Sequence, residues 1–342
     1  MDEGVLRQTV ADLVAPSRGI LAADESTRTI KRRFDSIGVE STEENRRAYR
    51  SLLLTTPGVG EYICGVILFE ETLGQADGDG TPLPQVAANA GVVPGIKVDK
   101  GTVPLPGAPG DLVTEGLDGL AGRLEGYKEQ GARFAKWREV YNITDDLPSA
   151  LAISANAEVL ARYARICQEA DVVPIVEPEV LMDGGHTIER CAEVTEAVLH
   201  AVFAALDRHG VLLEGIVLKP NMVLPGGESD RKASPEEVAD ATLTVFRRAV
   251  PAAVPTINFL SGGQSAVEST ENLHAINAAS GEKPWALSFS YGRGLQAPAL
   301  AAWGGKVENE PAAQAAFFER ARLNGLARDG RYEGEPEASA AG

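Results

Sequence analysis

The sequence contains eight short apolar runs that recur at roughly even intervals along most of its length. They occupy residues 19–23, 62–69, 92–98, 132–138, 172–177, 215–219, 256–260 and 286–290. The spacing of roughly 30 to 45 residues leaves room for one strand and one crossover helix in each unit. Several runs are nearly continuous in Val, Ile and Leu, which is typical of parallel strands covered on both faces. An α/β architecture with eight such units favours a TIM (β/α)8 barrel over a doubly wound sheet, which rarely needs eight regular units.

The segments between the runs have helical signals. Residues 187–209 place apolar side chains at helical spacing, and Gly210 follows as a residue that ends helices. Two capping boxes are predicted, Ser41 with Glu44 and Ser234 with Glu237.

One domain accounts for most of the chain. Residues 101–119 are rich in Gly and Pro and predict a long loop on the barrel rim. Residues 333–342 (EGEPEASAAG) are acidic and small, which predicts a flexible tail. No linker is evident, so we expect a single barrel domain over 1–332, followed by the tail at 333–342.

The charge of the chain limits its partners. The formal net charge is −17, with 24 % charged and 44 % apolar residues. Such an acidic chain is a poor partner for nucleic acid or for an anionic membrane surface. An anionic small molecule would need locally concentrated Lys and Arg.

Cysteine usage and the N-terminus predict a cytoplasmic protein. The three cysteines, Cys64, Cys167 and Cys191, fall in apolar segments without paired spacing, which favours reduced core thiols. The first residues, MDEG, are acidic and unlike a secretory signal. No apolar stretch approaches the roughly 20 residues that a membrane-spanning helix needs.

Lys219 ends the apolar run 215–219, and Pro220 follows it directly. A lysine at the tip of a buried strand is partly desolvated, which disfavours its charged form. At an ordinary pKa of about 10.4, only about one lysine in two thousand is neutral at pH 7. Lys219 is therefore either an ordinary lysine that reaches solvent or an amine nucleophile for a carbonyl substrate.

Four other runs also end in a charged residue: Asp24, Lys97, Lys136 and Glu177. Lys136 and Arg138 share one strand face, as do Glu177 and Glu179, because alternate residues of a strand point the same way. Barrel enzymes build their sites from such strand ends, and a carboxylate near a lysine nucleophile is a natural proton shuttle. Surface ion pairs, or an N-cap role for Asp24, are the alternatives.

Phosphate-binding signals follow the last two runs. SGG at 261–263 and YGR at 291–293 supply a hydroxyl, backbone amides and a guanidinium beside glycines. The loops after strands seven and eight are the recurrent phosphate site of a (β/α)8 barrel. The four histidines have no metal-ligand spacing, and no dinucleotide or ATP motif occurs, so no metal or cofactor is expected.

Seven segments in one order resemble the class I fructose-bisphosphate aldolase family. They are GILAADES (19–26), GIKVDKG (95–101), FAKWR (134–138), PIVEPE (174–179), LKPNM (218–222), FLSGGQS (259–265) and WALSFSYGR (285–293). The resemblance runs from near residue 5 to about residue 330. It implies metal-independent, reversible cleavage of fructose 1,6-bisphosphate in glycolysis and gluconeogenesis, through a covalent Schiff base on Lys219 and no other cofactor.

The resemblance also implies a role for each matching residue. Glu177 is the acid/base of imine formation, Lys136 lowers the pKa of Lys219, Asp24 takes the C4 hydroxyl proton and Glu179 orients the lysines. The C1 phosphate falls to four residues: Ser261, Gly262, Gly292 and Arg293. The C6 phosphate end falls to Ser26, Thr29, Arg33 and Lys97, with Arg138 on the sugar or on that phosphate.

The sequence departs from the family pattern in three places. Many members end in a tyrosine that assists protonation of the enamine, whereas this chain ends in Ala341-Gly342. Thr29 stands where the family often has serine, and Arg28 where it usually has glycine. Fructose 1-phosphate and sedoheptulose 1,7-bisphosphate therefore stay open as substrates, as does a non-catalytic phosphosugar-binding scaffold. The family further implies a homotetramer.

Overall fold

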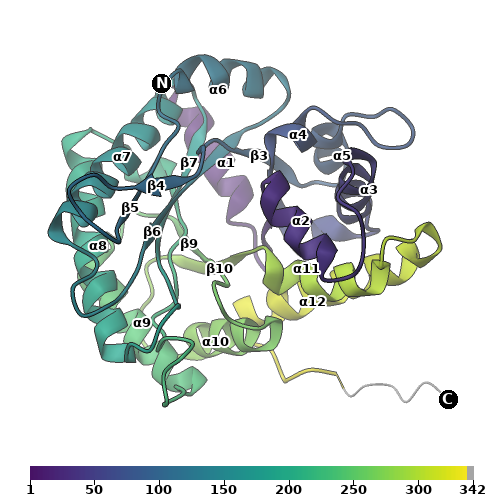
Figure 1. Ribbon diagram of the computed structural model, residues 1–342. Helices are drawn as coiled ribbons and strands as arrows, with labels where there is room; N and C mark the ends of the chain where they lie inside the picture. The colour runs from purple at the N-terminus through teal and green to yellow at the C-terminus, as the bar shows by residue number, and fades with distance from the viewer. Residues whose placement is uncertain (337–342) are drawn as a thin grey trace.

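Eight parallel strands form the centre of the computed structural model, which describes residues 1–336 (Figure 1). The strands are β1 (Gly19–Ala23), β2 (Ile63–Leu68), β3 (Val93–Lys97), β6 (Phe134–Tyr141), β7 (Val173–Val180), β8 (Val217–Leu218), β9 (Thr256–Phe259) and β10 (Ala286–Tyr291). They close into a barrel in the order β1-β10-β9-β8-β7-β6-β3-β2. The predicted barrel is confirmed, and each of the eight apolar runs overlaps one of its strands.

Helices surround the strands, as Figure 1 shows. They are α1 (Glu3–Leu13), α2 (Thr27–Asp35), α3 (Glu43–Leu54), α4 (Glu70–Leu73), α5 (Leu83–Asn89), α6 (Leu120–Glu129), α7 (Ala150–Glu169), α8 (Ile188–Arg208), α9 (Pro235–Ala249), α10 (Ala266–Ala278), α11 (Arg293–Trp303) and α12 (Glu310–Arg328). Single 3-10 turns occur at η1 (Val59–Glu61), η2 (Leu213–Gly215) and η3 (Val307–Asn309). No helix among residues 1–336 is long and apolar enough to cross a membrane.

Alternate strand residues build two separate hydrophobic clusters. On β1, Ile20 and Ala22 belong to a cluster inside the barrel, whereas Leu21 and Ala23 join the larger cluster between strands and helices. This alternation follows from the two-residue repeat of a strand. The interior row of β1 continues into Asp24, so the same geometry that fills the barrel also orients the charge at its end.

Helix α1 closes the N-terminal end of the barrel. Its buried residues Leu6, Val10 and Leu13 pack in the interior cluster with strand residues such as Phe134 and Val173. Directly after α1, Arg328 of α12 donates to the carbonyl oxygens of Val14 and Ala15. Apolar side chains thus close the N-terminal end of the barrel interior.

Two local predictions are wrong. Residues 101–119 are not a plain loop, because β4 (Thr102–Pro104) and β5 (Leu112–Thr114) pair there as an antiparallel hairpin. Helix α3 is capped by Thr42, whose hydroxyl accepts the Asn45 amide, and not by Ser41. Side chains of either residue suit an N-cap, so the sequence alone does not choose between neighbours.

Other local predictions are confirmed. Ser234 and Glu237 form the predicted capping box of α9, and Gly210 follows α8 with a φ of +61°. The three cysteines are buried and unpaired. In the predicted tail, Glu335 pairs with Arg320, while residues 337–342 lie outside the described part of the chain, so the division at 332 stays a prediction.

Candidate active site

The interior rows of four strands end in charge at the same end of the barrel. Lys136 follows Phe134 in the interior row of β6, and Glu177 follows Ile175 in that of β7. Lys219 comes one residue after β8, where its amide donates to the Val176 carbonyl at 2.8 Å. Because the strands are parallel, these side chains meet at one place, as predicted.

Asp24, Lys136, Glu177 and Lys219 form one chain of ion pairs. The Lys219 Nζ lies 3.1 Å from Glu177 Oε1, and the Lys136 Nζ lies 3.0 Å from Glu177 Oε2. The Lys136 Nζ also lies 3.0 Å from Asp24 Oδ2. The side chains of Lys219 and Glu177 are 4 % and 3 % exposed, so this amine and its carboxylate are shielded from bulk water.

Attraction outweighs burial in this chain of charges. Burial acts to raise the pKa of Asp24, but the charges of Lys136 and Lys219 lower it far below its ordinary value. Burial acts to lower the pKa of Lys136, yet Asp24 and Glu177 raise it well above its ordinary value. Lys136 therefore stays a cation and Asp24 an anion across the physiological pH range.

A second set of ion pairs lies beside the first. Arg138 Nε lies 2.5 Å from Glu179 Oε2 across the β6–β7 pairing. Lys97 at the end of β3 lies 2.5 Å from Asp99 Oδ1. Glu179, for which the resemblance implies a role in orienting the lysines, pairs with Arg138. Lys97 pairs with Asp99, a carboxylate outside the predicted site residues.

The loops after β9 and β10 meet. Arg293, the first residue of α11, donates from Nη2 to the Gly262 carbonyl at 3.1 Å. Gly262 has a φ of +53°, a conformation that glycine adopts without strain. A β-carbon on Gly294 would lie 3.2 Å from that of Ser261. The four residues predicted for a phosphate therefore form one loop pair.

Three of the residues predicted for a second phosphate lie at the start of α2 or within it. Ser26 caps α2, with its hydroxyl 3.2 Å from that of Thr29. Arg33, one turn further on, lies on the side of the β10 loop, because a β-carbon on Gly292 would be 3.6 Å from Arg33 Nη2. Its guanidinium pairs with Glu25.

Several residues of this region belong to no motif that predicted a role for them. Glu25 and Asp99 follow selected residues by one or two positions, so only their burial distinguishes them from ordinary strand-end acids. Ser290 is buried in β10 with a hydroxyl that has no partner among the described residues. Gln296 contributes from α11 a side chain that no local pattern singles out.

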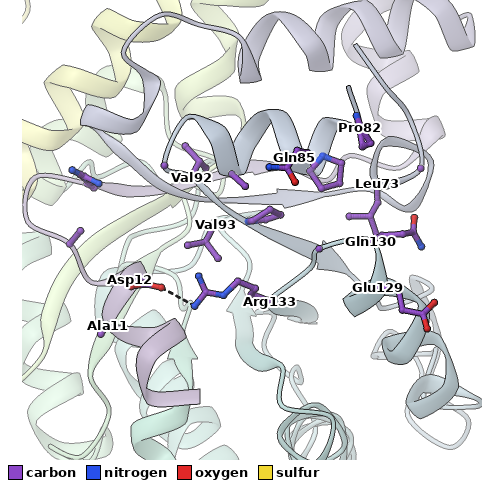
Figure 2. Close-up of a pocket in the computed structure, with 18 residues that line it drawn as sticks. Ala11, Asp12, Leu73, Pro82, Gln85, Val92, Val93, Glu129, Gln130 and Arg133 are labelled. Atoms are coloured by element: carbon purple, nitrogen blue, oxygen red, sulfur yellow. Dashed lines mark ion pairs between the residues drawn. The ribbon is translucent and has the colours of Figure 1, made fainter. Parts of the chain in front are cut away.

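One surface cavity lies elsewhere. It has a volume of about 890 Å³ and is lined by the starts of β3 and β6, the end of α1 and the ends of α5 and α6. Figure 2 shows Asp12 and Arg133 paired there. This cavity is at the N-terminal end of the strands and holds none of the predicted site residues. No group of three or more potential metal ligands occurs in the described residues 1–336.

A closed (β/α)8 barrel with a buried lysine, a bridging carboxylate and a loop pair suited to phosphate defines an enzyme class, that of enzymes acting on phosphorylated carbonyl compounds through an amine. Comparison with known families agrees with this class. The chain belongs to the class I fructose-bisphosphate aldolase family, described as glycolytic, whose sequence profile matches residues 5–342. The family match supports a metal-independent aldolase.

Several named relatives cover most of the chain. A cytosolic fructose-bisphosphate aldolase of Arabidopsis thaliana is 58 % identical over 94 % of this chain and 82 % of its own length. Aldolase C of Rattus norvegicus is 56 % identical over 96 % of this chain and 91 % of its own. The solved structure of the Plasmodium falciparum aldolase, bound to TRAP and an inhibitor, has a TM-score of 0.95 and 52 % identity, covering 97 % of this chain and 96 % of that one.

Proposed function

We propose that this class I aldolase uses Lys219 to cleave fructose 1,6-bisphosphate reversibly into dihydroxyacetone phosphate and glyceraldehyde 3-phosphate. The observation that carries the proposal is the position of Glu177, within 3.1 Å of Lys219 Nζ and 3.0 Å of Lys136 Nζ. The Glu177 carboxylate can accept a proton from the Lys219 amine while Lys136 holds the carboxylate in place.

Imine formation uses Lys219 and Glu177. Glu177 first takes one proton from the Lys219 ammonium. The neutral nitrogen then attacks the C2 carbonyl, and one of its protons moves to the carbonyl oxygen to give a carbinolamine. Glu177 then delivers a proton to the C2 hydroxyl, which leaves as water while the protonated imine forms. The low exposure of both groups supports this step, because a shielded site limits competition from bulk water.

Bond cleavage uses Asp24. Its carboxylate, kept ionised beside Lys136, takes the proton of the C4 hydroxyl. The electrons of the C3–C4 bond move to the imine nitrogen, so glyceraldehyde 3-phosphate leaves and an enamine remains on Lys219. Protonation at C3 and addition of water then release dihydroxyacetone phosphate and restore the free amine.

Phosphate binding falls to loops and strand ends. We assign the C1 phosphate to Ser261, Gly262, Gly292 and Arg293, whose contacts draw the β9 and β10 loops together. Towards the C6 phosphate we place Ser26, Thr29 and Lys97, with Arg138 on the sugar or that phosphate. Arg33 pairs with Glu25 near Gly292, which favours the C1 end.

Aldol cleavage assays test this proposal. We expect wild-type protein to cleave fructose 1,6-bisphosphate fully in EDTA, and Lys219→Met to lose at least about a thousandfold in kcat. Arg165→Met, which alters a partly exposed α7 side chain paired with Glu169, is the control and keeps full activity. Activity in Lys219→Met near that of the wild type would refute the assignment and favour the non-catalytic scaffold.

The preferred sugar, the assembly and the compartment are separate proposals. We propose that the enzyme prefers a bisphosphate, so kcat/KM should be higher for fructose 1,6-bisphosphate than for fructose 1-phosphate. The opposite order would make the monophosphate the preferred substrate. A higher kcat/KM for sedoheptulose 1,7-bisphosphate would make that sugar the preferred substrate. We also propose a homotetramer in the cytoplasm, and two similar Arabidopsis thaliana aldolases are named as cytosolic.

A further inference from the structure

We propose that Glu25 is a positioning residue for phosphate binding, because its carboxylate holds the guanidinium of Arg33 beside Gly292 in the loop after β10. The inference rests on the proposed function, which assigns that loop to a phosphate. It adds to it a residue that does not touch the substrate and acts through Arg33.

Both carboxylate oxygens of Glu25 are engaged. Oε1 accepts from Arg33 Nη1 and, at 2.8 Å, from Gln296 Nε2. Oε2 lies 2.5 Å from Arg50 Nη2. The Glu25 side chain is only 5 % exposed. One buried carboxylate thus fixes Arg33 of α2, Arg50 of α3 and Gln296 of α11, an arrangement that we call the clamp.

The two arginines differ in exposure. Arg50 is 3 % exposed, whereas Arg33 is 23 % exposed, and its Nη2 lies near Gly292. A structural ion pair is complete with Arg50 alone. The second guanidinium leaves one positive charge in excess, and that charge lies beside the loop pair that the proposed function gives to a phosphate.

Electrostatics keep Glu25 charged. Burial acts to raise its pKa, but Arg50 and Arg33 outweigh burial and lower the pKa below its ordinary value. An ionised carboxylate is needed for the clamp, since a neutral acid would hold the guanidinium of Arg33 only weakly.

Gln296 connects the clamp to the second arginine of the site. It lies one turn after Arg293 on α11, and its Nε2 also donates to the Ala22 carbonyl at 2.7 Å. Glu25, Ala22 and Gln296 therefore fix the start of α11 against the end of β1. Glu25 sets the position of Arg33 directly and that of Arg293 through this helix.

Inhibition by inorganic phosphate tests the proposal in the full-length protein. In Glu25→Gln we expect the phosphate inhibition constant and the KM for fructose 1,6-bisphosphate to rise about tenfold, with kcat changed less than about threefold. Glu25→Asp keeps the charge and should recover part of the loss. Asp12→Asn weakens a more exposed ion pair with Arg133 at the opposite barrel end and should match the wild type (Figure 2).

A second readout separates this idea from the proposed function. Dihydroxyacetone has no phosphate, so its borohydride trapping on Lys219 should be equal in wild type and Glu25→Gln. Failure to trap in the wild type would refute the proposed function. Normal trapping with an unchanged phosphate inhibition constant in Glu25→Gln would overturn only the role of Glu25, and a lower melting temperature alone would make Glu25 structural.

A milder variant covers the case in which Glu25→Gln does not fold. Gln296→Met removes the hydrogen bonds from Nε2 to Glu25 and to the Ala22 carbonyl, while the side chain stays similar in size. It should raise the phosphate inhibition constant about two- to threefold and leave dihydroxyacetone trapping unchanged. A wild-type inhibition constant in a folded Gln296→Met protein would contradict the clamp.

Discussion

Lys136 lies between two carboxylates, and this position decides what it can do. Its amine is 3.0 Å from both Asp24 and Glu177, which raise its pKa despite burial. Lys136 therefore acts as a fixed cation between the two carboxylates and keeps Asp24 ionised. The nucleophile of the proposal is instead Lys219, whose amine is within reach of one carboxylate oxygen, on Glu177.

Glu139 on the outer face of β6 should make stability depend on pH. Its side chain is fully buried and its pKa is raised well above the ordinary 4.5, because burial outweighs the hydrogen bond from Trp137. The folded protein keeps this proton above pH 4.5 while the unfolded chain loses it. Stability should therefore fall as pH rises from 4.5 to the folded-state pKa, by about 1.4 kcal/mol per pH unit.

The variant Glu139→Gln removes this titration. Urea unfolding of both proteins at several pH values should show the variant gaining on the wild type as pH rises above 4.5. A stability difference that stays constant with pH would show that Glu139 is ionised in the folded protein.

At the residue scale, sequence patterns found side chains that end a strand and missed those that act through others. Lys219 and Glu177 follow apolar runs, so their position predicts a shared site. Gln296 lies inside a helix and reaches Glu25 over 271 positions of chain, a contact that no local pattern contains.

Among the elements, α1 depends on α12 for its position at the N-terminal end of the barrel. Arg328 donates to two carbonyl oxygens at the end of α1, where the helix leaves them without intrahelical partners. Arg328→Met should lower the free energy of unfolding by about 2 kcal/mol, measured in urea, without changing kcat/KM. Unchanged stability, or a lower kcat/KM in fully folded protein, would count against this role.

Element boundaries followed from the sequence to within a few residues. The run at 19–23 matches β1, because turn residues bound it on both sides. The β4–β5 hairpin escaped prediction, since its three-residue strands are too short to show alternation against a background of Gly and Pro.

For the whole molecule, the net charge of −17 contrasts with the cations gathered at one barrel end. The proposed homotetramer predicts a particle of four times the 36.1 kDa chain mass. Light scattering coupled to gel filtration measures this directly at micromolar concentration. A mass near 36.1 kDa would show that the chain works alone.

Reductive trapping tests the central claim about Lys219 most directly. Wild-type protein is treated with borohydride in the presence of dihydroxyacetone phosphate, digested, and its peptides mapped by mass spectrometry. The account predicts one reduced adduct, on the peptide that contains Lys219, and none in Lys219→Met. An adduct on Lys136 instead, or no adduct on any lysine, would contradict it.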